Sequence, residues 1–147
     1  MFSTRAIQKI LIVSMSLMLL PFMADAQCKS WTKRKCNPLL APYKFNETFN
    51  SAQLSPGEEA TVNLTFFEGQ EYRIVICAQG QVSPVSWKLK SGSQIIFESL
   101  ADDPKGSFDL KMESTEQLQV VVWVADQETT TGIVNLGCVS ILVGFKE

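Results

Sequence analysis

Residues 59–78 read EATVNLTFFEGQEYRIVICA, and this stretch decides the fold. From Ala60 to Phe66, apolar side chains alternate with Thr and Asn, which is the period of a strand with one buried face. Glu68-Gly69-Gln70 follows as a short connection in which glycine accepts a positive φ at little cost. The next run, 71–78, is apolar on both faces, which is typical of a central strand. The stretch therefore predicts an antiparallel hairpin.

Five further runs downstream have the same strand-like character and are joined by short polar turns. They cover residues 85–90, 94–99, 107–112, 117–125 and 137–145. Residues 43–49 suggest an eighth strand, and no run shows a convincing period of 3.6 residues. The pattern predicts an all-β domain over residues 43–147, an antiparallel β-sandwich of the jelly-roll type with seven to eight strands.

The first 26 residues have the three parts of an export signal. Arg5 and Lys9 precede a run of 15 uncharged residues, 10–24, and Ala24-Asp25-Ala26 offers small residues to a signal peptidase. The uncharged run is shorter than the ~20 apolar residues of a bilayer span. We therefore expect cleavage after Ala26 rather than a retained anchor, a mature chain without a membrane span, and a secreted or periplasmic protein.

The four cysteines, Cys28, Cys36, Cys77 and Cys138, all follow this cleavage site. Because an exported chain meets an oxidising compartment, we expect two disulfides. Of the three possible pairings, sequence proximity favours Cys28–Cys36, closing an irregular arm over residues 27–42, together with Cys77–Cys138 between two strands. A zinc site built from all four thiolates is the alternative, although the usual C-x2-C spacing is absent.

Composition narrows the class of function. The chain has no histidine, which removes the commonest general base and the Ser–His and Cys–His nucleophile pairs. Without Arg5, Lys9 and Asp25, which fall in the signal peptide, the mature chain keeps 11 basic and 14 acidic residues, a formal net charge of −3. Nucleic-acid binders normally carry a basic excess. We therefore predict a non-enzyme with no cofactor and no nucleic-acid partner.

Trp31 lies beside the basic cluster Lys33-Arg34-Lys35. An indole face together with three positive charges would bind an anionic glycan or another anionic surface. The alternative is a solvated loop whose charges face water.

Trp87 and Trp123 both fall in strand-like runs. Trp123 is out of phase with Val120, Val122 and Val124, so it points to the opposite face of its strand. It either covers a second packed face or offers an exposed aromatic ring to a sugar.

Two further sets of polar residues allow two interpretations each. Asp102, Asp103 and Asp109 would supply hard oxygen ligands to calcium, but Asp-Asp-Pro-Lys-Gly is also ordinary turn chemistry. Asn46 and Asn63 begin N-x-Thr glycosylation sequons, which matter only in a eukaryotic secretory pathway.

The order of several motifs resembles the pre-peptidase C-terminal-type domain, a jelly-roll-like sandwich of exported bacterial proteins. Gly69, Tyr72, Ile74 and Ile76 match its first strand motif, and Trp87-Lys-Leu-Lys-Ser-Gly92 follows its second in outline. The resemblance covers residues 54–145 and implies a non-catalytic accessory or binding module.

Two functions follow from these observations. The first is an exported, non-catalytic module that binds a glycan or a protein outside the cytoplasm through its loops or a sheet face. The second is a structural or assembly protein that associates with itself through exposed sheet edges.

Overall fold

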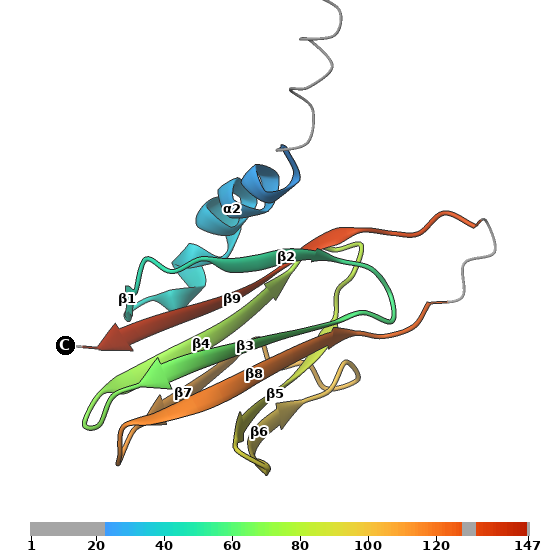
Figure 1. Ribbon diagram of the computed structural model, residues 1–147. Coiled ribbons are helices and arrows are strands. Elements are labelled where there is room, and N and C mark those ends of the chain that lie inside the picture. Colours follow the sequence, from blue (N-terminus) through green and yellow to red (C-terminus); the bar gives the residue numbers. More distant parts are fainter. Residues whose placement is uncertain (1–22, 128–131, 147) are drawn as a thin grey trace, which may run out of the picture.

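Nine β-strands, one α-helix and one 3₁₀ helix make up the part of the chain that the computed structural model describes, residues 23–127 and 132–146 (Figure 1). In chain order they are α2 (Met23–Lys35), η1 (Asn37–Leu40), β1 (Lys44–Phe45), β2 (Asn50–Leu54), β3 (Glu59–Phe66), β4 (Glu71–Ala78), β5 (Val85–Ser91), β6 (Gln94–Ser99), β7 (Ser107–Lys111), β8 (Glu116–Val124) and β9 (Gly137–Lys146).

The strands form two antiparallel sheets packed face to face. One sheet has the order β1-β9-β4-β7, with β2 also paired to β9, and the other has the order β3-β8-β5-β6. The chain pairs from its ends inward, β2 with β9, β3 with β8, β4 with β7 and β5 with β6, which is the nested pairing of a jelly roll. The predicted fold class is confirmed.

The core lies between the two sheets and follows the predicted alternation. Val120, Val122 and Val124 of β8 face inward against Trp87 of β5, whose ring is fully buried. The Trp87 indole N–H donates to the carbonyl of Lys105 at 2.7 Å, so burial leaves this polar group paired. Trp87 is therefore a core residue.

The predicted eighth strand, 43–49, is wrong in its bounds. The structure has a two-residue strand, β1, and a separate strand, β2, and both pair with β9 along one edge. Between them, the side chain of Asn46 accepts the Thr48 N–H at 3.1 Å and Glu47 has a φ of 63°. This turn chemistry interrupts the strand.

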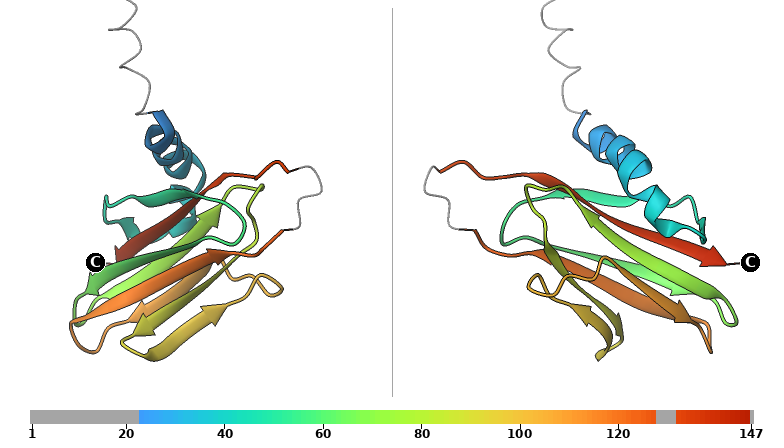
Figure 2. Two further views of the ribbon diagram at one scale, coloured as in Figure 1. Left: turned by 45° about the vertical axis from the view of Figure 1, so that its right-hand side comes forward. Right: turned by 180° about the vertical axis from the view of Figure 1, so that it is seen from behind.

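The arm over residues 27–42 is helical, which corrects the prediction of an irregular segment. Cys28, Thr32 and Cys36 are spaced by four and are all buried, so one face of α2 and its continuation packs on the outer face of the β9–β4 sheet (Figure 2). Residues 23–26 form the start of α2, and the rest of the predicted signal peptide, 1–22, lies outside the described residues. No helix in the described ranges has the length and apolar character of a membrane span.

The predicted cysteine pairing is also wrong. The bridges are Cys28–Cys138 and Cys36–Cys77, with Cα–Cα distances of 5.4 and 5.9 Å. A helix rises 1.5 Å per residue, so eight residues separate Cys28 from Cys36 by about 12 Å, beyond the reach of a disulfide. The first bridge therefore ties α2 to β9, and the second ties Cys36, the residue that follows α2, to β4.

A second, smaller core lies under α2 and η1. Its buried members are Cys36, Leu40, Val75 and Leu142, and Trp31 packs against them. Gly144 of β9 lies under Tyr43 and Leu40, where an added Cβ would come within 2.8 Å of the Tyr43 Cβ and 3.1 Å of a Leu40 methyl carbon. This second layer explains why β4 and β9 are apolar on both faces.

Candidate binding site

Four connections meet at one end of the sandwich. They are the β2–β3 turn (55–58), the β4–β5 loop (79–84), the β6–β7 loop (100–106) and the long β8–β9 loop (125–136). Figures 1 and 2 show the described parts of the β8–β9 connection, residues 125–127 and 132–136, running beyond the sheets at this end. In a fold of this kind, binding residues tend to lie on loops that a rigid scaffold positions.

The first stem of the β8–β9 loop is anchored to the β2–β3 turn. Val124 N–H donates to the carbonyl of Glu58 at 3.0 Å, and Gly57 N–H donates to the carbonyl of Val124 at 3.0 Å. The Asp126 carboxylate then fills the space beside Gly57 that a Cβ would need. Gly57 has a φ of 83°, so glycine serves both the turn and the close approach.

The second stem is anchored more strongly. Cys138 is bridged to Cys28 of α2, and its backbone exchanges hydrogen bonds with Gln79, whose side-chain oxygen accepts the Cys138 N–H at 2.8 Å. The preceding residue, Gly137, is buried against Val82, and an added Cβ would lie 2.6 Å from a valine methyl carbon. The loop thus returns to the sheet through a covalently tied and tightly packed position.

Between these stems, residues 132–136 carry three solvent-exposed aliphatic side chains, and we name this segment the apolar tip. Ile133, Val134 and Leu136 are 68%, 60% and 55% exposed. Single exposed apolar residues are common on protein surfaces, but three within four positions form a patch that typically marks an interaction site.

Acidic residues lie at the end of the sandwich from which the apolar tip projects, and Lys105 of the β6–β7 loop at this end is paired with Asp103. Between Lys111 and Lys146 the sequence contains no Lys or Arg. Asp126 and Glu58 both lie at this end, and hydrogen bonds to Ser55, first from its backbone N–H at 2.7 Å, lower the pKa of Glu58. The glutamate is therefore ionised at neutral pH.

The predicted basic site lies elsewhere. Lys33, Arg34 and Lys35 are exposed in the last turn of α2, where positive charge interacts favourably with the helix dipole. Trp31 is half-buried and packs on the small core beneath the helix. The structure thus gives Trp31 a packing role and leaves the three cations facing solvent.

Trp123 lies on the outer face of the other sheet, so the structure does not bring it together with Trp31. It is half-buried between Glu59 of β3 and Ser86 of β5, and the Lys88 ammonium lies 5.1 Å from its ring centroid. The predicted orientation away from the core is confirmed, while a ligand-binding role for Trp123 stays a prediction.

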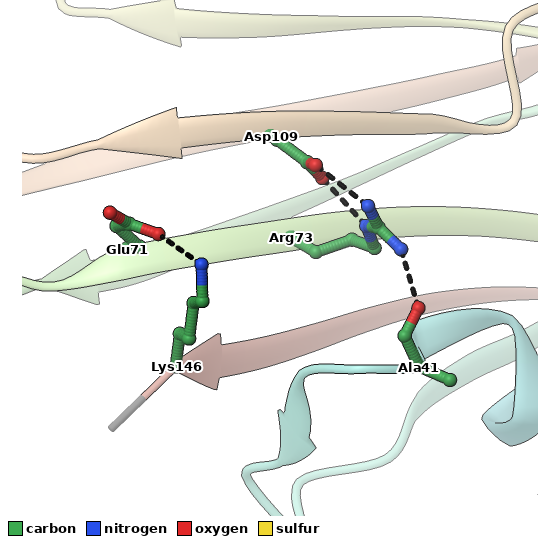
Figure 3. Close-up of polar contacts among 5 residues, drawn as sticks. All are labelled: Ala41, Glu71, Arg73, Asp109 and Lys146. Atoms are coloured by element: carbon green, nitrogen blue, oxygen red, sulfur yellow. Dashed lines mark hydrogen bonds and ion pairs between the residues drawn. The ribbon is translucent and has the colours of Figure 1, made fainter.

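The densest polar cluster fixes the arm to the sheet (Figure 3). Arg73 donates two hydrogen bonds of 2.7 Å to the Asp109 carboxylate and a third, also 2.7 Å, to the carbonyl of Ala41. These bonds lower the pKa of Asp109 and raise that of Arg73. Lys146 pairs with Glu71 at 3.1 Å on the same sheet. The cluster clamps β4, β7 and the segment after η1 to one another.

The remaining sequence candidates are distributed over the surface. Asp103 pairs with Lys105 at 3.2 Å, and Asp109 belongs to the Arg73 clamp. Among the described residues, no group of three or more acidic or cysteine side chains is arranged to hold a metal ion. The side chains of Asn46 and Asn63 are both exposed.

No protein-family model and no curated protein matches the chain. Among solved structures, the chain is similar to the crystal structure of PliG from Aeromonas hydrophila, a periplasmic lysozyme inhibitor of g-type lysozyme. The identity is 13% and the TM-score 0.48, and the match covers 71% of this chain and 89% of that one.

Sequence reasoning missed the apolar tip. Gly132-Ile-Val-Asn-Leu136 directly precedes the apolar run of β9 and is indistinguishable from a strand entrance by composition. One sequence signal did indicate a segment separate from β9. The three aliphatic residues follow a polar, Thr-rich stretch, and Gly137 breaks the sequence between them and the apolar run of β9.

Proposed function

We propose that this protein is an exported, non-catalytic module that binds a protein partner by inserting its apolar tip into an apolar cleft. The observation that carries the proposal is the exposure of Ile133, Val134 and Leu136 on a loop whose two stems are both fixed. Because the stems are ordered before binding, less conformational entropy is lost when the tip is buried, which favours affinity. The two disulfides support a location in an oxidising compartment.

The surrounding charge defines the kind of partner. Asp126 and Glu58 lie at the end of the sandwich from which the tip projects, which favours an apolar cleft bordered by Lys or Arg as the complementary surface. The same acidity disfavours an anionic membrane surface, which attracts basic segments. The described part of the tip also lacks an aromatic ring, the usual stacking surface for a sugar.

The test compares capture by a tip variant and by a matched surface variant. Ile133→Asp/Leu136→Asp changes the tip, and Phe67→Asp changes a residue that is 59% exposed at the opposite end. Mature wild-type protein is immobilised and exposed to secreted and envelope fractions of its source. A specific partner is retained by wild type and by Phe67→Asp but lost with the tip variant, and the purified pair should lose at least about 30-fold in Kd, the scale of an interface hot spot.

Three results would contradict the proposal. The first is equal affinity of the tip variant, with unfolding curves showing that both variants are folded. The second is saturable binding in a glycan array that disappears in Trp123→Ala. The third is turnover of a glycan or peptide substrate by the purified protein.

One observation favours self-association as a second candidate. Ile95 and Ile96 are exposed on β6, an edge strand of its sheet. A register shift between β5 and β6 places a bulge there, which disfavours pairing with another strand. Light scattering over a range of concentrations tests this candidate. Oligomers that form in the wild type and are abolished by Ile95→Lys would favour self-association through β6 over partner binding by the apolar tip.

A further inference from the structure

One side of the sandwich is left uncovered along β3. Among the described residues this edge strand pairs only with β8, and a groove of about 340 Å³ opens between it and β2, at the edge of the other sheet. The core-facing side chains of Ala60, Val62 and Leu64 are therefore only half-buried. Val120 and Val122, which lie opposite on β8, are fully buried.

The other sheet edges carry features that oppose pairing with a further strand. β6, at the opposite edge of the same sheet, contains a register shift. In the other sheet, the β1–β2 edge is interrupted at Glu47, and the five-residue strand β7 carries Asp109 and Lys111. β3 has eight residues in one unbroken register with β8, and Ala60–Phe66 contains no charge, proline or glycine. Because natural sheets usually block their edges, this unblocked one indicates a pairing surface.

The backbone groups of alternate β3 residues point away from the sheet. Glu58, just before the strand, accepts the Val124 N–H at 3.0 Å, so its backbone carbonyl faces β8. In an antiparallel ladder this direction alternates along the strand, which turns the N–H and C=O groups of residues 59, 61, 63 and 65 outward. These four residues form a row of donors and acceptors that is open to another strand.

We propose that two copies of this protein pair through β3, antiparallel and with Val62 on the two-fold axis, so that their four-stranded sheets join into one. In this register residue 59 pairs with 65 and residue 61 with 63, so every outward-facing residue has a partner within β3. A shift of two residues in either direction leaves one of the four without a partner in the strand.

The side chains fit the same register. On the inner face, Ala60 lies opposite Leu64 of the second copy, so a small side chain meets a large one, and Val62 lies opposite Val62. On the outer face, Glu59 lies opposite Thr65 rather than another carboxylate. The pairing thus covers the three core-facing side chains that a single copy leaves half-exposed, and no like charges meet along the strand.

Sedimentation velocity of the mature, oxidised protein over a range of concentrations tests the proposal, and we expect a reversible equilibrium between monomer and dimer. Asn63→Pro removes an N–H that points away from β8, so the ladder within the fold is kept while each copy loses a hydrogen bond to the other. The dissociation constant of the dimer should rise at least about tenfold. Asn63→Ala is the matched control, since it shortens the same side chain but keeps the N–H, and it should dimerise as wild type does.

A charge pair on the two-fold axis tests the register. Val62→Lys brings two ammonium groups together and Val62→Glu two carboxylates, so each variant alone should be monomeric. An equimolar mixture of the two variants should form a dimer again, because opposite charges then meet. Thermal unfolding of each variant establishes that it is folded, and a folded mixture that stays monomeric would overturn the proposed register.

A wild-type protein that stays monomeric at every concentration would overturn the proposal, as would equal dimerisation by Asn63→Pro and Asn63→Ala. Ile95→Lys, at the opposite edge of the sheet, should leave the dimer intact. A dimer lost with Ile95→Lys but kept with Asn63→Pro would place the contact on β6 instead. The apolar tip lies outside β3, so Ile133→Asp/Leu136→Asp should also dimerise as wild type does, and failure of this pairing leaves the proposal of partner binding by the tip unaffected.

Discussion

Removal of either disulfide should destabilise the protein by an amount that depends on which cysteines it joins. Cys36–Cys77 closes a loop of 41 residues, and the chain-entropy relation gives it about 3.9 kcal/mol. Cys28–Cys138 spans 110 residues of sequence, but the Cys36–Cys77 bridge shortens the loop that it closes. The shorter path runs through eight residues from Cys28 to Cys36 and 61 residues from Cys77 to Cys138. For a loop of about 70 residues the same relation gives about 4.4 kcal/mol.

Urea unfolding of the oxidised protein measures these values. We expect Cys36→Ala/Cys77→Ala and Cys28→Ala/Cys138→Ala to lose similar free energies of unfolding, each about 4 kcal/mol. If Cys28 were instead paired with Cys36, the small loop would contribute only about 2.5 kcal/mol, and the single variants Cys28→Ala and Cys36→Ala would behave alike.

Peptide mapping without reduction gives an independent answer, because trypsin places the four cysteines in four different peptides, 27–29, 36–44, 74–88 and 112–146. We expect 27–29 joined to 112–146 and 36–44 joined to 74–88. A peptide pair linking 27–29 to 36–44 would refute the helical geometry of residues 28–36, since a helix holds those two cysteines too far apart.

Three further changes test the packing around α2 and β9. Asp109→Asn should reduce the loss of stability that we expect below about pH 4, because Arg73 lowers the pKa of Asp109 in the folded state. The ion pair contributes its full stabilisation above the unfolded-state pKa of Asp109, and this contribution disappears as the pH falls through the lower folded-state pKa. An acid titration followed by circular dichroism measures the difference between the two proteins. Gly144→Ala should cost about 1–3 kcal/mol in urea unfolding, because its Cβ would press on Tyr43 and Leu40; an unchanged midpoint would show that the segment from Leu40 to Tyr43 is not packed on β9 there. Trp31→Ala should lower the free energy of unfolding by about 1–2 kcal/mol, less than for a fully buried Trp, and an unchanged value would restore its interpretation as an exposed ligand-binding ring.

The sandwich was predictable because alternation is a local property that burial imposes on each strand. Apolar and polar residues alternate from Ala60 to Phe66 in the sequence, and the apolar ones face the core in β3. Strand β2 was not predictable in this way. Asn50-Ser-Ala-Gln-Leu54 has small and polar side chains, because half of this edge strand borders a groove rather than a packed interior.

The helical arm escaped sequence reasoning for a different reason. Its buried stripe consists of Cys28, Thr32 and Cys36, residues that a search for aliphatic periodicity does not register. Once the arm is taken as irregular, short sequence separation favours Cys28–Cys36. The wrong pairing thus followed from the missed helix. Had the helix been predicted, its length would have ruled out Cys28–Cys36, since a helix holds these two cysteines too far apart.

The sequence offers only one weak signal for the apolar tip, the break at Gly137, because exposure is a tertiary property. Ile133 and Val134 differ in no local respect from Val139 and Ile141, which lie in β9 and are buried. What separates them is Gly137, where the chain turns into the sheet against Val82.

The correct cysteine pairing changes how the candidate site is understood. With Cys77–Cys138, both ends of a bridge would lie on neighbouring strands that hydrogen bonds already hold together, and the start of β9 would gain little. With Cys28–Cys138, the bridge joins α2 to the residue two positions after Leu136, so the second stem of the loop is fixed from the sheet and from the helix at once. The Arg73 clamp and the Cys36–Cys77 bridge hold the other end of the arm. The helix therefore stabilises the loop through its Cys28–Cys138 disulfide, which fixes the stem that follows the apolar tip.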